Sequence, residues 1–201
     1  MREAPRADSK TTPGIRVLAI GGSTRPTSTS ERALGIAASA ASAAGADVRV
    51  MSGRDLLIPI YDTETAERDP GARALVEAAR AADGLIVVSP GYHGGISGLV
   101  KNALDYFEDL GDDQRPYLDG RAVGCIAVAH GWQATVSTLH QLRQVVHALR
   151  GWPTPLGGAV NSSLLRLERP ADDDPVVAQL RVIGEQVVEF ARMQQAFRGT
   201  L

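Results

Sequence analysis

Five short apolar runs alternate with five helical patterns along this chain, and this alternation restricts its fold more than any other feature. The apolar runs cover residues 15–20, 48–51, 85–88, 123–129 and 156–160. Apolar residues recur every three or four positions over residues 34–44, 75–82, 99–110, 136–149 and 176–190, which places each set on one face of a helix. Strands that alternate with helices pair in parallel and are covered on both faces. The sequence therefore predicts an α/β fold with a doubly wound, five-stranded parallel sheet.

The length and charge of the chain limit its domain organisation and its partners. We expect a flexible N-terminal arm over residues 1–13 and a single domain over residues 14–201, a length that one hydrophobic core can serve. The arm lacks the apolar core of a signal peptide, and no apolar stretch approaches the length of a membrane span. A net charge of −2 offers no basic surface for nucleic acid. A cytoplasmic protein with a small-molecule ligand, without a nucleic-acid or membrane partner, is the expectation.

The single cysteine, Cys125, gives no sign of a metal or thiol site. One cysteine cannot form an internal disulfide or contribute to a multi-cysteine metal site. Its surroundings, VGCIAV, predict a buried strand position. The histidines lack metal-ligand spacing, and no Ser-His-Asp or Cys-His set can be argued. We therefore predict no metal ion and assign no catalytic residue.

Small hydroxyl residues follow the first apolar run directly. The run breaks at Gly21-Gly22, and the next helical pattern begins shortly afterwards. Such a strand–turn–helix junction directs backbone N–H groups and the positive end of a helix at one point, which favours a phosphate. The residues expected to surround that phosphate are Ser23, Thr24, Arg25, Ser28, Thr29 and Ser30.

The kind of phosphate follows from what this turn lacks. It matches neither the G-x-G-x-x-G turn that binds dinucleotides nor the G-x-x-x-x-G-K-[ST] loop that binds nucleoside triphosphates. Hydroxyls around one arginine suit a terminal phosphomonoester, such as that of FMN. The alternative is an ordinary turn with a serine or threonine that caps the next helix.

Two further segments should lie near this turn, because ligands of such sheets bind at the carboxyl ends of strands. The segment after the third run, Ser89–Gly98, is rich in glycine and carries Tyr92 and His93, which can contact the edge or face of a flat ligand. A solvent loop shaped by glycine is the alternative. The segment after the fourth run contains His130, Gly131 and Trp132. Trp132 could form a pocket wall or a dimer contact.

Together these segments resemble the NADPH-dependent FMN reductases of the flavodoxin-like superfamily, which include two-component monooxygenase reductases and related quinone and azo reductases. The phosphate loop of that family, G-S-x-R-x-x-S, is met by Gly22, Ser23, Arg25 and Ser28. Its later signature, P-x-Y-x-G-x-x-x-G-x-x-K-N-x-x-D, is met by Pro90, Tyr92, Gly94, Gly98, Lys101, Asn102 and Asp105. The resemblance extends over nearly all of residues 14–160 and implies the flavodoxin-like strand order 2-1-3-4-5.

The resemblance also implies a set of cofactor-binding residues. The phosphate of FMN would be held by Ser23, Arg25, Ser28, Thr29 and Ser30. The flavin ring would be lined by Pro90, Gly91, Tyr92, His93 and Gly94. Gly95, His130, Gly131 and Trp132 are further candidate cofactor-binding residues because of their place at the ends of the predicted strands. Many family members carry Glu at the position of Gly91 and Asn at that of His93, so this chain departs from the pattern at both. Arg25 could also reach a phosphate of NADPH.

The activity implied is hydride transfer from NADPH, or NADH, to FMN, with a flavin or a quinone-like compound as acceptor. Reduced flavin could be supplied to a flavin-dependent monooxygenase. The alternative is a reductase of quinones, azo or nitro compounds that keeps FMN tightly bound, and a flavodoxin-type electron carrier is a further alternative. The resemblance implies a homodimer or homotetramer, joined through the helices expected over residues 99–110 and 136–149.

Overall fold

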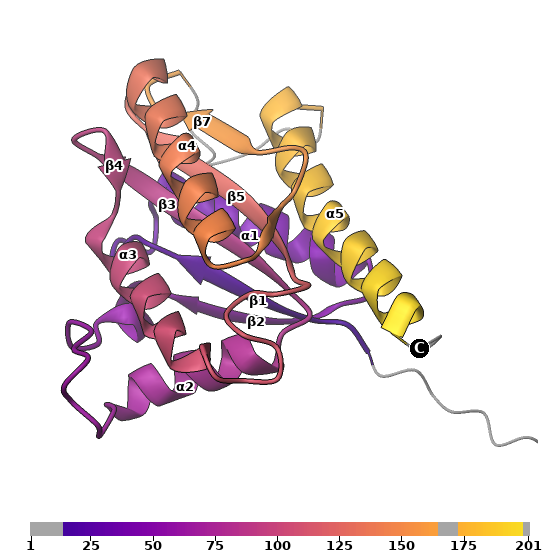
Figure 1. Ribbon diagram of the computed structural model, residues 1–201. Coiled ribbons are helices and arrows are strands. Elements are labelled where there is room, and N and C mark those ends of the chain that lie inside the picture. Colours follow the sequence, from indigo (N-terminus) through magenta and orange to yellow (C-terminus); the bar gives the residue numbers. More distant parts are fainter. Residues whose placement is uncertain (1–13, 165–172, 199–201) are drawn as a thin grey trace, which may run out of the picture.

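The parallel sheet is built outward from β1 (Arg16–Gly21), which lies between β2 (Asp47–Ser52) and β3 (Gly84–Tyr92) (Figure 1). β5 (Ala122–Ala129) pairs with the other edge of β3. β6 (Trp152–Pro153) and β7 (Gly158–Asn161) both pair in parallel with β5. The order β2-β1-β3-β5-β6 is the predicted order 2-1-3-4-5 when the principal strands are counted along the chain, so the fold prediction is confirmed.

This computed structural model describes residues 14–164 and 173–198. The predicted flexible arm over residues 1–13 lies outside the described residues, so it stays a prediction, as does the extent of the domain over residues 14–201.

The last strand is interrupted, whereas the sequence predicted one continuous strand over residues 156–160. Val123 of β5 pairs with Pro153, but Ile126 pairs with Gly158. The outer segment therefore contains two more residues than β5 between these pairs. Pro155 lies in the interruption and has no N–H group to donate to the sheet. The proline explains why the ladder breaks into two short strands.

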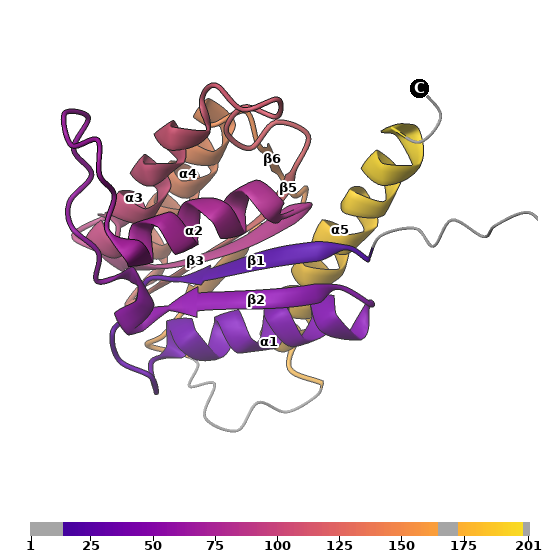
Figure 2. The same ribbon diagram turned by 90° about the horizontal axis from the view of Figure 1, so that it is seen from below.

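Within residues 14–164 and 173–198, five helices cover the two faces of the sheet, as predicted (Figures 1 and 2). α1 (Thr29–Ala43) and α5 (Pro175–Arg198) pack on one face, whereas α2 (Pro70–Ala81), α3 (Gly98–Asp105) and α4 (Trp132–Ala148) pack on the other. The helix predicted over 99–110 changes after α3 into the 3-10 turn η2 (Tyr106–Leu110), and a second 3-10 turn, η1 (Gly53–Leu56), was not predicted.

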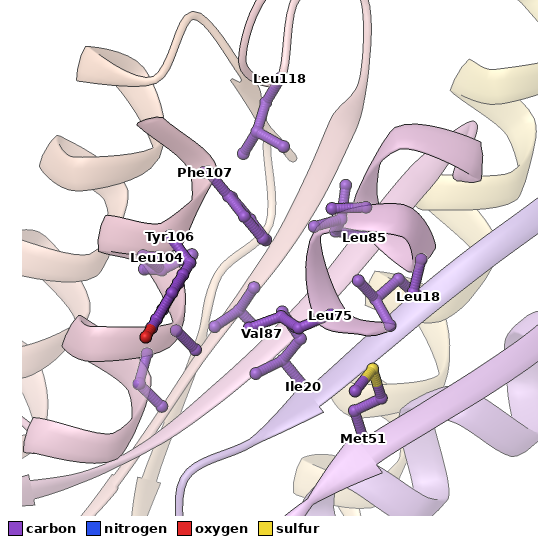
Figure 3. Packing of buried hydrophobic residues seen from close by; sticks show 14 of the residues in the cluster. Leu18, Ile20, Met51, Leu75, Leu85, Val87, Leu104, Tyr106, Phe107 and Leu118 are labelled. Carbon is purple, nitrogen blue, oxygen red and sulfur yellow. The ribbon is translucent and has the colours of Figure 1, made fainter. Parts of the chain in front are cut away.

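Alternation along the strands divides the core in two. Leu18 and Ile20 of β1 point toward α2, α3 and α4 and join the cluster drawn in Figure 3. Val17 and Ala19 point to the opposite face and pack against α1 and α5. The two helices approach closely there, because an added Cβ at Gly184 would meet the carbonyl oxygen of Ala37. Both faces of β1 are thus buried, which fixes the position of the turn that follows it.

β3 is longer than its apolar run and ends in a hairpin, not in the solvent loop given as the alternative for Ser89–Gly98. The strand continues to Tyr92, turns at His93-Gly94 and returns as β4 (Gly95–Ile96), with Gly91 opposite Ile96. His93 and Gly94 have φ angles of 52° and 83°. A two-residue hairpin turn of type I′ needs positive φ at both positions.

Candidate functional site

A cleft of about 600 Å³ opens at the carboxyl ends of β1, β3 and β5. Ligands of doubly wound sheets bind at this edge of the sheet. Its walls come from the turn after β1, the first turn of α1, the end of β3 and the end of β5. The lining residues are Ser23, Thr24, Arg25, Thr27, Ser28, Thr29, Ser30, Arg32, Pro90, Gly91, Tyr92, Val128, Ala129, His130 and Ser162.

The turn after β1 presents hydroxyls and amides to this cleft. Ser23 Oγ accepts a hydrogen bond of 3.2 Å from Arg25 N, and the hydroxyls of Ser28 and Ser30 lie 3.0 Å apart. Thr29 and Ser30 begin α1, so their N–H groups have no partner within the helix. These groups and the positive end of the helix make one end of the cleft suitable for an anion.

Ser28 has two roles at once. Its side chain accepts a hydrogen bond of 3.2 Å from Glu31 N and so caps α1. The alternative interpretation of this stretch, a hydroxyl residue that caps a helix, is therefore correct for Ser28. Because Ser28 also lines the cleft, the cap is compatible with anion binding at the same helix end.

Arg25 carries the exposed cation of this turn. Its side chain lines the cleft and makes no ion pair or side-chain hydrogen bond with any residue in the described ranges 14–164 and 173–198. A guanidinium in this position can bind a phosphate without breaking an existing contact.

The end of β3 forms the second wall of the cleft and is held from behind. Ser97 N donates a hydrogen bond of 2.9 Å to Ser89 Oγ, and Ser97 Oγ caps α3 by accepting from Val100 N at 3.2 Å. A Cβ atom at Gly91 would lie 2.5 Å from Thr138 Oγ1 on α4. Glycine at this position therefore lets the strand pack directly on α4.

The end of β5 leads into a second hollow of about 460 Å³ beside the cleft. Gly131 has a φ of 104° and donates a hydrogen bond of 3.0 Å to Asn161 Oδ1 of β7. Thr135 Oγ1 donates to Gly131 O at 2.7 Å. The residues around this hollow are His93, Gly94, His130, Gly131, Trp132, Gln133, Ala134 and Ser137. His130 lines both spaces, so the hollow adjoins the cleft.

The predicted cofactor-binding residues thus divide between the two spaces. The cleft brings together Ser23, Arg25, Ser28, Thr29, Ser30, Pro90, Gly91, Tyr92 and His130. The adjoining hollow contains His93, Gly94, Gly131 and Trp132. Gly95 lines neither space, because it pairs with Tyr92 within the hairpin and faces the side chain of Gln141.

Sequence reasoning missed several residues of the cleft. Val128, Ala129 and Ser162 line it, although the first two read as buried strand positions. Arg32 lies one helical turn after Ser28, and this spacing of four residues could have identified it. Ser162 follows β7 directly, so it could have been found as another carboxyl end of a strand.

Three residues of the later family signature stabilise the fold: Lys101, Asn102 and Asp105. Asn102 is buried and donates a hydrogen bond of 2.9 Å to Pro59 O. Lys101 and Asp105 form an ion pair on the exposed side of α3. None of the three residues lines the cleft.

Cys125 is fully buried in β5, as predicted. Burial raises the pKa of its thiol to about 12, so it stays protonated and unreactive at neutral pH. Residues 14–164 and 173–198 contain no group of three or more His, Cys, Asp or Glu side chains that could hold a metal ion. Within the same ranges, no helix has both the length and the apolar character that a membrane span requires.

Comparison with known sequences places most of the chain in one family. Residues 15–163 match the sequence model described as NADPH-dependent FMN reductase. An NADPH azoreductase of Bacillus sp. (strain OY1-2) is 33% identical over 86 residues, which are 42% of this chain and 45% of that protein. An FMN-dependent NADPH-azoreductase of Staphylococcus aureus (strain USA300) is 32% identical over 120 residues, 58% of this chain and 60% of that protein. The chain thus spans about half the length of the curated relatives that it matches.

Solved structures share the fold at low sequence identity. FerB, a flavoenzyme NAD(P)H:(acceptor) oxidoreductase from Paracoccus denitrificans, superimposes with a TM-score of 0.72 at 15% identity, over 90% of this chain and 99% of that one. A flavodoxin, WrbA-like protein from Agrobacterium tumefaciens gives a TM-score of 0.61 at 18% identity, over 90% and 99%. The flavodoxin-like architecture is therefore confirmed.

Proposed function

The chain belongs to the NADPH-dependent FMN reductase family, and from this premise we propose that it is a NAD(P)H-dependent flavin reductase that transfers hydride from NADPH, or NADH, to FMN. One observation carries the proposal. The hydroxyl-rich turn before α1, the end of β3 and the end of β5 line a single cleft, although they are far apart in the sequence.

The residues present fit the phosphate of FMN at one end of the cleft. Serine and threonine hydroxyls surround the start of α1, and Arg25 supplies a positive charge. We propose that Ser23, Arg25, Ser28, Thr29 and Ser30 hold this phosphate. Hydroxyls, amides and one guanidinium can satisfy the oxygens of a phosphomonoester.

We assign the flavin ring to the part of the cleft at the ends of β3 and β5. Pro90, Gly91 and Tyr92 line it at the end of β3, and His130 lines it at the end of β5. We propose that these residues, together with His93, Gly94, Gly131 and Trp132 of the adjoining hollow, position the flavin ring and the second substrate. FMN, when bound, supplies the hydride acceptor of the reaction. The protein would hold the nicotinamide ring against the flavin ring and exclude water. Because hydride passes directly between the two rings, we assign no acid or base of this chain to the step.

Titration of the purified protein with FMN tests this proposal. We expect a change in the visible spectrum of FMN and a higher melting temperature of the protein, followed by rapid oxidation of NADPH once both are present. FMN that leaves its own spectrum and the melting temperature unchanged would contradict the assignment.

A second candidate is a reductase that keeps FMN tightly bound and reduces azo, quinone or nitro compounds. It is favoured by the curated relatives, which are named azoreductases. Steady-state kinetics separate the two candidates, because release of reduced flavin differs from ping-pong turnover with retained flavin. A flavodoxin-type electron carrier is less favoured, since a net charge of −2 gives little acidic surface for docking, and it would oxidise NADPH only slowly.

We further propose a cytoplasmic homodimer or homotetramer that supplies reduced flavin to a flavin-dependent monooxygenase. Exposed apolar side chains on α4 and the neighbouring hairpin support self-association: Trp132, Val136 and Tyr92. Light scattering tests the assembly, and a monomeric mass would count against it. Coupled turnover with a monooxygenase, compared with free reduced flavin added at the same rate, tests the partner.

A further inference from the structure

The start of α1 contains half of a capping box. Ser28 and Glu31 have the spacing S-x-x-E, in which the glutamate normally accepts a hydrogen bond from the backbone N–H of the capping residue. Ser28 Oγ does accept from Glu31 N, at 3.2 Å. However, Ser28 N donates to Arg25 O at 3.0 Å, so the reciprocal bond is absent and the Glu31 carboxylate is available for another contact.

The Glu31 carboxylate instead contacts the turn after β1. Its Oε1 atom accepts a hydrogen bond of 3.4 Å from Ser23 N. A Cβ atom at Gly21 would lie 2.7 Å from the same oxygen, so the carboxylate lies against the backbone where β1 ends. An anionic side chain thus occupies one amide of the turn that we assign to the flavin phosphate.

Nothing in the described ranges neutralises this carboxylate by an ion pair. The side chain does not line the cleft, and it approaches the turn from the side of Ser52 on β2, whose Cβ also lies beside Gly21. A phosphate bound in the turn would therefore have the Arg25 cation on the cleft side and the Glu31 anion behind the backbone.

We propose that Glu31 is a specificity-determining residue that weakens binding of the flavin phosphate and thereby makes FMN an exchangeable ligand. This inference rests on the proposed function, in which the turn binds that phosphate. Negative charges on either side of the same turn repel each other, most strongly where solvent is partly excluded. The hydrogen bond to Ser23 N meanwhile holds the turn in shape, so the carboxylate keeps the site formed while it limits affinity.

Glu31→Gln separates charge from hydrogen bonding, because glutamine keeps an acceptor oxygen for Ser23 N. FMN and riboflavin are titrated into the wild-type protein and this variant, with flavin fluorescence as the readout. Riboflavin lacks the phosphate and reports on the rest of the site. We expect FMN to bind about tenfold more tightly to Glu31→Gln, equal to about 1.4 kcal/mol, with riboflavin affinity unchanged.

A matched control and a pH series distinguish repulsion from a structural effect. Glu189→Gln removes the same charge from an exposed position on α5 and should leave both affinities as in the wild type. The second pKa of a phosphate ester is about 6, so the gain in FMN affinity should be larger at pH 7.5 than at pH 5.5. If Glu31 had only a structural role, the gain in FMN affinity would not change with the charge of the phosphate.

The outcomes separate this inference from the proposed function. Wild-type protein that binds FMN, combined with a variant that binds FMN no more tightly or tightens both flavins equally, overturns the role of Glu31 and leaves the flavin reductase intact. Failure of the wild-type protein to bind FMN overturns both. Glu31→Ala, which removes the charge together with the acceptor for Ser23 N, serves as the second variant if glutamine prevents folding; the ratio of FMN affinity to riboflavin affinity is then expected to rise, and an unchanged ratio overturns the role of Glu31.

Discussion

Asn102 on α3 holds the backbone of Tyr61, 41 residues earlier in the chain, through a hydrogen bond of 2.9 Å from Tyr61 N to Asn102 Oδ1. The amide nitrogen of Asn102 donates to Pro59 O at 2.9 Å, and the hydroxyl of Tyr106 donates to the same oxygen at 3.1 Å. One buried amide thus fastens the segment after η1 to α3. The asparagine of the second motif stabilises the fold next to the cleft, and the cleft itself is lined by other residues.

Replacement of Asn102 by alanine should lower the free energy of unfolding by about 1–3 kcal/mol, because it leaves the part-buried Tyr61 N without its partner and removes one of the two donors to Pro59 O. Urea denaturation measures this change. Lys101→Ala is the matched control, since it removes only an exposed ion pair with Asp105 and should cost at most about 0.5 kcal/mol. Equal effects of the two substitutions would show that Asn102 does not hold the segment.

Gly91→Ala should destabilise the protein by about 1–3 kcal/mol through overpacking. The added Cβ would lie 2.5 Å from Thr138 Oγ1 and 3.0 Å from Ala129 Cβ. Thr138→Ala removes the nearer atom, so the double variant should lose less stability than the sum of the two single variants. A double-mutant cycle in urea measures this coupling, and strict additivity would contradict the contact.

The strands, the helices and the cover on both faces of the sheet could be predicted from repeated patterns in the sequence, whereas the order of the strands was implied by the family resemblance. Val17, Leu18, Ala19 and Ile20 form a continuous apolar run, and such a run indicates a strand that is buried on both faces. The interruption of the last strand was not predicted. It depends on Pro155 and on a register shift against β5 that only strand pairing reveals.

Most residues of the candidate site that lie in the turn after β1 were predicted from the sequence, whereas several of those inside a strand or a helix were missed. Ser28 and Arg25 were predicted because hydroxyl residues and a cation directly after a strand indicate a phosphate site. Val128 was missed because a strand residue that lines a cleft has the same composition as one in the core. Glu31 was missed because the S-x-x-E spacing indicates a capping box, and only the structure shows that Ser28 N is already bonded to Arg25 O.

Cys125 should contribute a pH-dependent part of the stability. Burial raises its pKa in the folded protein from 9.0 to about 12. A raised folded-state pKa means that this contribution is complete below pH 9 and is lost as the pH rises from 9 toward 12. Between pH 8 and pH 10 the wild-type protein should therefore lose about 1.4 kcal/mol more free energy of unfolding than Cys125→Ala. Parallel losses measured by urea denaturation would contradict the raised pKa.

The same burial predicts the reactivity of the thiol. A thiol-specific reagent at pH 8 should leave Cys125 unmodified in the folded protein and label it in urea, because only the thiolate reacts. Labelling of the folded protein at the rate of a free thiol would show that β5 opens at this position.

Arg25 provides the most direct test of the phosphate end of the cleft. Arg25 lines the cleft, and a charge-assisted hydrogen bond from its guanidinium to a phosphate would contribute about 1.5–3 kcal/mol. Arg25→Ala should therefore weaken FMN binding roughly 10- to 100-fold while it leaves riboflavin binding unchanged. Arg73→Ala, on the exposed side of α2, removes the same charge elsewhere and should change neither affinity. Titration of both variants with NADPH shows whether Arg25 also binds the phosphate of the hydride donor. If Arg25→Ala binds FMN and riboflavin as the wild type does, Arg25 does not bind the flavin phosphate.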